Sequence, residues 1–277
     1  MTQYSMPLNL PLRPFLVAYV TCGDPNLAAS KGIILSAIAA GADVIELGVP
    51  FSDPVADGPV IQRASERALA NHTRLSDVLQ LAEEIRNAEN RVGLIVFSYY
   101  NPVLRYGLEQ FCHDAREAGI DGALITDLTV EEAGDYITAM RKRDLATVFL
   151  AAPTSTDARL KAIAAASRGF VYAVSRTGVT GTQQNLADDA GKLVRRVKKF
   201  TKLPVAVGFG ISNSEQFHAA GEFADGVVVG SAIVQVIEKN SASGNAAKAV
   251  GEFIQGLKKK HSALGSQHSA PKQAFST

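Results

Sequence analysis

The sequence predicts an α/β protein, a single-domain (β/α)8 TIM barrel. Short apolar runs recur along the chain, and most are continuous rather than alternating, as in strands buried on both faces of a parallel sheet. Amphipathic helical patterns separate these runs, and eight such units fit a chain of 277 residues. An open doubly wound sheet is the alternative, but no Gly-x-Gly-x-x-Gly follows the first run, which disfavours it.

The apolar runs define the predicted strands. They are Phe15–Val20, Val44–Leu47, Leu94–Phe97, Ala123–Ile125, Thr147–Ala151, Phe170–Val174, Val205–Val207 and Val227–Val229. Run starts are typically 22 to 35 residues apart, which is the length of one βα unit. The exception is a step of 50 residues between the second and third runs, and this step contains a proline-rich stretch described below.

Three of the connections show a clear helical stripe. The stretch Leu75–Ala88 has apolar residues on one face, and Ser76 is its expected N-cap. Leu108–Gly119 stops at a glycine, as many helices do. Leu186–Phe200 repeats the same spacing of apolar residues. Helices between the strands are what the barrel requires.

The two ends of the chain differ from the middle. Residues 1–14 contain three prolines and cannot form a long helix, so we expect this segment to pack at the barrel bottom through Leu8, Leu10 and Leu12. Residues 262–277 are polar, and a disordered tail is expected there. No linker or repeat divides residues 15–261, which we interpret as one barrel domain.

Bulk composition excludes several classes of protein. Apolar residues make up 47% of the chain, and the net charge of +1 implies no general attraction to nucleic acid or to a membrane. The two cysteines cannot form a disulfide framework. No secretory signal and no apolar run of about 20 residues is evident. A cytoplasmic globular protein is therefore expected.

Glycine-rich segments follow the last three predicted strands. They contribute Gly181, Gly210, Gly230 and Ser231. Glycine lets the backbone approach a ligand and direct N–H groups at it, and a helix N-terminus favours an anion. Barrel enzymes often bind phosphate in this quarter, at the carboxyl ends of the strands. The alternative is that these glycines only make tight turns.

Glu46 lies inside the second apolar run. A carboxylate in a buried strand is costly if it is ionised and unpaired, and catalytic acids and bases are made in this way. A structural glutamate paired with an arginine or with backbone is the alternative. Asp57 falls in the long connection after this run, although an aspartate before Gly-Pro is also an ordinary turn.

Other mechanisms lack their residues. The five histidines are scattered and none ends a strand, so no metal site is expected. No lysine directly follows an apolar run, and no Gly-x-Ser-x-Gly elbow occurs. Cys22 is expected near the barrel mouth, but no histidine follows a neighbouring strand to activate it, so we interpret it as packing or lining. The mechanism that remains is acid–base chemistry on a phosphorylated small molecule, without a cofactor.

The motifs resemble one known family. They are "IELGVPFSDPVADGPVIQ" at Ile45, "TCGDP" at Thr21, "YYNPV" at Tyr99, "APTS" at Ala152, "YAVSRTGVTG" at Tyr172, "VGFGI" at Val207 and "GSAIV" at Gly230. Together they are similar to the tryptophan synthase alpha chain over roughly 15–237. The resemblance implies a (β/α)8 barrel that cleaves indole-3-glycerol phosphate to indole and glyceraldehyde 3-phosphate. It also implies an alpha2beta2 heterotetramer, in which a beta chain receives the indole and carries the pyridoxal phosphate.

The resemblance also implies roles for individual residues. Glu46 matches the general acid–base residue, and Asp57 matches a second catalytic carboxylate that contacts the indole N–H. The implied indole pocket comprises Phe209, Tyr172, Phe97 and Ile61, and the implied lid comprises Thr180, Arg176 and Gly178. The implied contact with the beta chain comprises Pro50, Asp53, Pro54 and Asn101.

Two features depart from the family pattern. The N-terminal segment is proline-rich where the family has an amphipathic helix, and Thr129 stands where the family usually has proline. That loop can contact the partner, so a stand-alone lyase that needs no beta chain stays an alternative. A non-catalytic phosphate-binding barrel is a further alternative, disfavoured by the pair of carboxylates.

Overall fold

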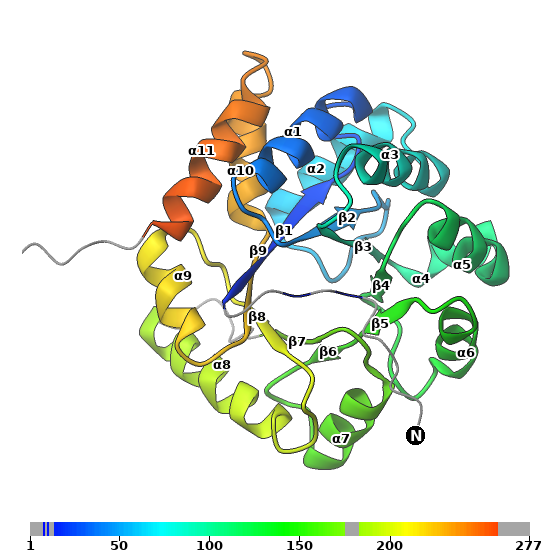
Figure 1. The fold of residues 1–277 in the computed structure, drawn as a ribbon, viewed down its shortest axis with the longest axis vertical. Helices are drawn as coiled ribbons and strands as arrows, with labels where there is room; N and C mark the ends of the chain where they lie inside the picture. The colour runs from blue at the N-terminus through cyan, green and yellow to red at the C-terminus, as the bar shows by residue number, and fades with distance from the viewer. Residues whose placement is uncertain (1–7, 9, 11–13, 175–182, 260–277) are drawn as a thin grey trace, which may run out of the picture.

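The computed structural model describes residues 8, 10, 14–174 and 183–259. Within this part of the chain, nine parallel strands form a sheet in the order β5-β4-β3-β2-β1-β9-β8-β7-β6. The strands are β1 (Phe15–Thr21), β2 (Val44–Gly48), β3 (Gly93–Ser98), β4 (Gly122–Ile125), β5 (Ala146–Val148), β6 (Leu150–Ala151), β7 (Val171–Val174), β8 (Val205–Gly208) and β9 (Gly226–Val229). The first and last strands of the chain, β1 and β9, pair with each other and lie in the middle of this order (Figure 1).

The two edges of the sheet are consecutive in the chain. The fifth predicted run divides into β5, which pairs with β4, and β6, which pairs with β7. Only Phe149 separates the two strands, so the ring of strands closes through the chain itself. The barrel prediction is therefore confirmed, with nine assigned strands in place of eight because one run changes its pairing partner midway.

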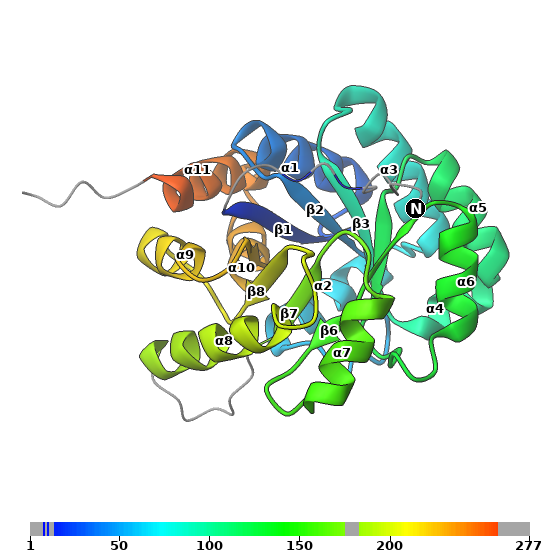
Figure 2. The ribbon, with the colours of Figure 1, turned by 60° about the horizontal axis from the view of Figure 1, so that its bottom comes forward.

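Helices surround the barrel on its outside, as Figures 1 and 2 show. They are α1 (Leu27–Ala39), α2 (Pro59–Ala70), α3 (Leu75–Ala88), α4 (Tyr100–Tyr106), α5 (Leu108–Glu117), α6 (Gly134–Lys142), α7 (Asp157–Ala166), α8 (Gln183–Val197), α9 (Ser214–Gly221), α10 (Ser231–Asn240) and α11 (Ala246–Lys258). Two helices, α2 and α3, fill the long step between the second and third predicted runs. In the described residues, no helix combines the length and apolar character that crossing a membrane requires.

The predicted helices are confirmed, with one correction. The helix α3 has Arg74 rather than Ser76 as its N-cap. The carboxylate of Asp77 accepts a hydrogen bond from the Arg74 backbone N–H at 2.8 Å, which closes the first turn one residue before Leu75. Ser76 is therefore inside the helix. The helix α5 ends before Gly119, which has φ +74°.

The core has two parts because successive strand residues face opposite sides of the sheet. Residues such as Ile45 and Leu47 face the helices, whereas Phe15, Val44 and Phe170 fill the barrel interior. Leu8 is 2% exposed and belongs to this interior cluster. Most of segment 1–14 and nearly all of 262–277 lie outside the described residues, so the division of the chain into three segments stays a prediction.

Candidate active site

A cavity of about 520 Å³ opens at the carboxyl ends of the strands. Side chains and backbone from seven strands or the connections after them line it: Ala56, Asp57, Gly58, Ile61, Phe97, Thr126, Leu150, Tyr172, Val174, Gly208, Phe209, Gly210, Ile211, Val228, Gly230 and Ser231. Eight of these residues were expected from the sequence at the site. The cavity occupies the position at which barrel enzymes bind their substrates.

Glu46 lies at the level of Tyr19 on β1 and Ile95 on β3, the neighbouring strands. Its position alternates with Ile45 and Leu47, which face the helices, so Glu46 faces the barrel interior. The residue is 1% exposed and does not itself line the cavity. Tyr172 links it to the cavity, because Tyr172 lines the cavity and its pKa is raised first by burial and then by the nearby charge of Glu46.

The carboxyl group of Glu46 is adapted to holding a proton. Burial raises its pKa to about 8, because the ionised form loses its hydration. Within the described part of the chain, its Oε1 atom is buried and has no hydrogen-bond partner. The alternative of a structural glutamate whose Oε1 is paired with an arginine or with backbone is thus not supported. A carboxyl group that is mostly protonated near neutral pH can act as a general acid.

Asp57 is held at the rim of the cavity by its own loop. Its backbone N–H donates to the carbonyl of Pro54 at 3.0 Å, and its carbonyl accepts from the Gln62 side-chain amide at 2.9 Å. Gln62 lies in the first turn of α2, so this helix anchors the loop immediately after Asp57. Asp57 therefore lies at the rim of the cavity, whereas Glu46 lies buried in the barrel interior.

Tyr99 is a further residue at the site whose contact with Asp57 was not predicted from the sequence. Its hydroxyl donates to the Asp57 carboxylate at 3.0 Å and accepts from the Ala56 backbone N–H at 2.9 Å. Burial, followed by the charge of Asp57, raises the pKa of Tyr99, so its hydroxyl stays a donor. The sequence places Tyr99 after the third strand, but no local signal indicates that it reaches a loop 42 residues earlier.

Tyr19 was also missed, although the sequence carries a signal for it. It follows Phe15 and Val17 at every second position of β1, so it faces the barrel interior beside Glu46. A Cβ atom on Gly48 would lie 2.4 Å from the Tyr19 hydroxyl oxygen, so the glycine makes room for the phenol ring. The ring packs edge-to-face on Phe97 with centroids 5.0 Å apart.

Three of the predicted phosphate-binding residues come together at one end of the cavity. Gly210, Gly230 and Ser231 all line it. Ser231 is the first residue of α10 and Gly230 is its N-cap, so the unpaired N–H groups of the first turn lie at this end. Gly210 has φ +84°, a conformation that favours glycine, and the space beside it is open. Backbone donors and the helix dipole suit a phosphate here.

The predicted indole pocket is the apolar part of the same cavity. Phe209, Tyr172, Phe97 and Ile61 all line it, and Thr126 and Leu150 extend it. A planar aromatic ring is a suitable occupant for a space bounded by these side chains. In the described part of the chain, no group of three or more His, Cys, Asp and Glu side chains is arranged to hold a metal ion.

The residues assigned to the partner differ in exposure. Asp53 and Asn101 are exposed, Pro54 is half-buried, and Pro50 is buried. Among the described residues, the large hydrophobic side chains that are exposed are Val55, at 82%, and Leu104, at 53%.

Four predicted residues cannot be placed. Gly181, Thr180, Arg176 and Gly178 belong to segment 175–182, which lies outside the described residues. The prediction that they bind phosphate or form a lid stays a prediction.

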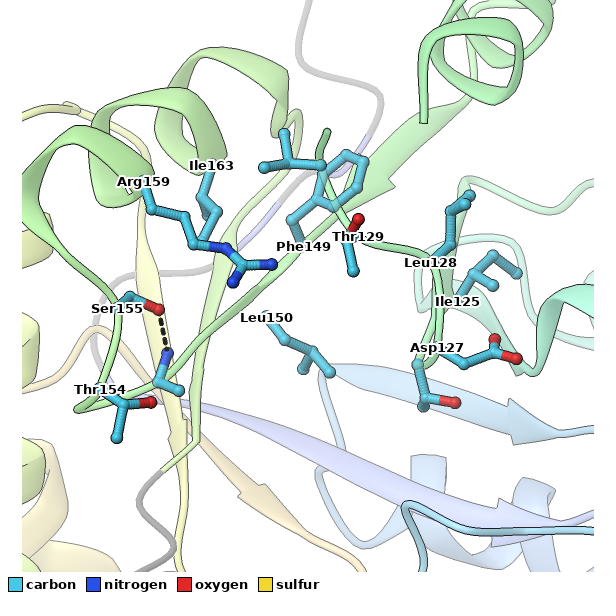
Figure 3. A pocket seen from close by; sticks show the side chains of 13 residues that line it. Ile125, Asp127, Leu128, Thr129, Phe149, Leu150, Thr154, Ser155, Arg159 and Ile163 are labelled. Carbon is cyan, nitrogen blue, oxygen red and sulfur yellow. Dashed lines mark hydrogen bonds between the residues drawn. The ribbon is translucent and has the colours of Figure 1, made fainter. Parts of the chain in front are cut away.

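A second cavity of about 260 Å³ adjoins the first and shares Thr126 and Leu150 with it. Figure 3 shows the side chains around it, which come from the connection after β4, from β6 and from α7. Thr129 lies here, and its hydroxyl donates to Glu132 at 3.1 Å, a bond that a proline could not make. The departure from the family pattern therefore changes the wall of a cavity next to the site.

Comparison with known proteins identifies the family of this chain. The family model of the tryptophan synthase alpha chain matches residues 8–262. A tryptophan synthase alpha chain of Solibacter usitatus is 51% identical over 247 residues, which cover 89% of this chain and 92% of the relative. One of Neisseria meningitidis is 43% identical over 243 residues, 88% of this chain and 92% of the relative.

Solved structures agree with these sequence relatives. A chain of Mycobacterium tuberculosis tryptophan synthase matches with a TM-score of 0.81 and 39% identity, covering 88% of this chain and 91% of the other. A chain of the tryptophan synthase complex from Pyrococcus furiosus matches with a TM-score of 0.80 and 36% identity, covering 89% and 99%. The protein described here is an enzyme subunit that belongs to the tryptophan synthase alpha chain family.

Proposed function

We propose that this chain cleaves indole-3-glycerol phosphate to indole and glyceraldehyde 3-phosphate by a retro-aldol reaction. The observation that carries the proposal is the buried carboxyl group of Glu46, with a pKa of about 8, next to a cavity whose rim holds Asp57. The cavity has an apolar part for the indole ring and a helix N-terminus for the phosphate.

Both proton transfers are assigned to Glu46. Its protonated carboxyl group donates to indole C3, which turns the ring into an indoleninium cation. The resulting carboxylate then removes the proton from the side-chain hydroxyl next to C3. The C–C bond breaks, its electron pair returns to the ring, and the aldehyde forms. Since Glu46 is 1% exposed, the proposal requires its side chain to turn into the cavity when the substrate binds.

Asp57 is assigned to the ring nitrogen. Its carboxylate accepts a hydrogen bond from the indole N–H, and its negative charge stabilises the indoleninium cation more than the neutral substrate. Tyr99 supports this role, because its hydroxyl donates to the carboxylate and also holds the backbone of Ala56. No step in this scheme uses a cofactor in this chain.

We further propose a beta-chain partner, in an alpha2beta2 heterotetramer that works in the cytoplasm and holds pyridoxal phosphate in the beta chain only. The matched structures of tryptophan synthase complexes support the partner. The exposed side chains of Val55 and Leu104 support the position of the contact, because they lie next to Asp53 and Asn101 in the sequence segments assigned to it.

The test measures indole release by the purified chain from indole-3-glycerol phosphate, with and without a tryptophan synthase beta chain. The Glu46→Gln variant, purified in the same way, controls for contaminating activity. Slow release that the beta chain greatly accelerates is the expected result. Equal rates with and without the partner indicate a stand-alone lyase. A parent chain no more active than the variant in either condition contradicts the proposal.

A further inference from the structure

A chain of ion pairs joins three segments behind the active site. Arg67 on α2 donates from its Nε and one terminal nitrogen to the two oxygens of Asp24, both at 2.8 Å. Its other terminal nitrogen donates to Glu238 on α10 at 2.9 Å. Arg63, one turn earlier on α2, donates to both oxygens of Glu238 at 2.9 and 3.0 Å. We call Asp24, Arg67, Glu238 and Arg63 the ion-pair clamp.

The clamp connects the two helices that begin at the site. The helix α2 starts at Pro59, two residues after Asp57, and its Gln62 holds the Asp57 carbonyl. The helix α10 starts at Ser231, where the phosphate is expected. Asp24 lies in the connection after β1, so the clamp fastens both helices to the barrel rim.

The fully buried apolar contact between these helices is small. It consists of Ala64 on α2 and Val234 on α10 together with Tyr19, and the partly buried Val60 and Ile61 of α2 pack against it. A small alanine leaves few contacts to resist sliding of α2 along α10. The clamp lies on the same pair of helices, and its bidentate geometry restricts both distance and angle. The pKa of Glu238 is lowered to about 2, mainly by its hydrogen bonds from Arg63. Glu238 therefore stays ionised at any pH used for an assay.

We propose that Arg67, by binding Asp24 and Glu238 at once, is a positioning residue that sets the distance between Asp57 and the expected phosphate site at Ser231. This inference rests on the proposed function for its kinetic consequences. The substrate spans both sites, with its ring at Asp57 and its phosphate at Ser231. A shift of about 1 Å between α2 and α10 therefore prevents it from reaching both, and misplacement of this size costs roughly 100-fold in rate.

A purely structural role is the competing interpretation. Asp24 is 1% exposed, so any variant that removes Arg67 also leaves a buried carboxylate unpaired and lowers stability. Arg67→Lys keeps one positive charge beside Asp24, but a lysine cannot bind Asp24 with two parallel bonds and Glu238 with a third. Glu238→Ala leaves the Asp24–Arg67 pair intact and removes only the link to α10. The second variant keeps the test valid if the first does not fold.

The matched control is Arg86→Lys. Arg86 forms an ion pair of 2.8 Å with Asp121, is 21% exposed, and also donates to the carbonyls of Val92 and Gly119. These partners precede β3 and β4, at the end of the barrel opposite the cavity. The control thus weakens a comparable arginine cluster without touching the site.

Two readouts are compared in the parent and the three variants. Steady-state indole release with the beta chain present gives kcat and KM, and hydrogen exchange followed by mass spectrometry gives the protection of residues 49–62 and 230–238. We expect Arg67→Lys and Glu238→Ala to lower kcat/KM at least about tenfold and to speed exchange in both segments. Arg86→Lys should lower the thermal midpoint while kcat/KM stays within about twofold and both segments keep their protection.

Values of kcat/KM within about twofold of the parent in the folded clamp variants, with unchanged exchange, overturn the inference. Equal losses in the Arg86→Lys control also overturn it. If the parent itself releases no indole, the proposed function fails, but the exchange of the two segments still decides whether the clamp restrains them.

Discussion

Replacing Glu46 by glutamine separates the catalytic use of this residue from its energetic cost. The carboxyl group has an ordinary pKa of 4.5 and a pKa of about 8 in the folded protein, where it is buried. Between these two values the folded protein keeps a proton that the unfolded chain releases. The free energy of unfolding therefore falls as the pH rises through this window, by about 1.4 kcal/mol for each pH unit.

The magnitude follows from the width of the window. The step from 4.5 to about 8 is about 3.5 pH units, which corresponds to about 5 kcal/mol at pH values above 8 and to about 3 kcal/mol at pH 7. Glutamine does not ionise, so Glu46→Gln removes this dependence. We expect the advantage of the variant over the parent to grow by roughly 2 to 3 kcal/mol between pH 5 and pH 7, and to grow little more above about pH 8.

The assay is urea unfolding followed by far-ultraviolet circular dichroism at several pH values, since the chain has no tryptophan. Indole release by the same samples should fall at least about 100-fold, because an amide cannot move protons. The reasoning on burial is refuted by a stability difference that does not change with pH. The reasoning on catalysis is refuted by turnover that survives in a folded variant. Leu47→Ala provides a control, because it should destabilise the same strand equally at every pH.

Three further predictions concern the rim of the cavity and the expected phosphate site. Asp57→Asn should keep the fold but lower kcat for indole release severely, though less than Glu46→Gln does, and a near-normal rate would count against its role. Tyr99→Phe removes the hydroxyl that holds Asp57 and Ala56, so steady-state kinetics should show kcat reduced about tenfold with KM nearly unchanged, and a raised KM alone would contradict this. Ser231→Asp should stabilise α10 by about 0.5 kcal/mol in thermal unfolding, because a carboxylate suits a helix N-terminus, yet raise KM at least about tenfold by repelling the phosphate. Unchanged KM in that variant would show that the phosphate binds elsewhere.

Much of the fold could be read from local patterns. Continuous apolar runs predicted the strands because a parallel sheet covered by helices is buried on both faces. The same patterns could not show that Thr147–Ala151 divides between two pairing partners, because pairing depends on where neighbouring strands lie when the barrel closes. The N-cap of α3 was misplaced because the Asp77 carboxylate, not a serine hydroxyl, completes the first turn.

The candidate site was predicted where a residue conflicts with its surroundings. Glu46 was recognisable as a carboxylate among apolar strand residues, and the three glycine-rich ends were recognisable by composition. Tyr99 looks like any aromatic residue after a strand, so its contact with Asp57 could not be predicted. Arg67 looks like one of many exposed helix charges, until the structure shows it against the buried Asp24.

The sequence by itself determined the barrel and the family and singled out the two carboxylates as candidates, because burial periodicity and short motifs are local properties of the chain. Only the tertiary structure decided how these parts act on one another. It buried Glu46 deeply enough to raise its pKa to about 8, and it brought the hydroxyl of Tyr99 onto Asp57. It also joined Arg67 to Glu238 across 171 residues. Desolvation and distance depend on what lies around a group in space, and the closing of the barrel creates those surroundings.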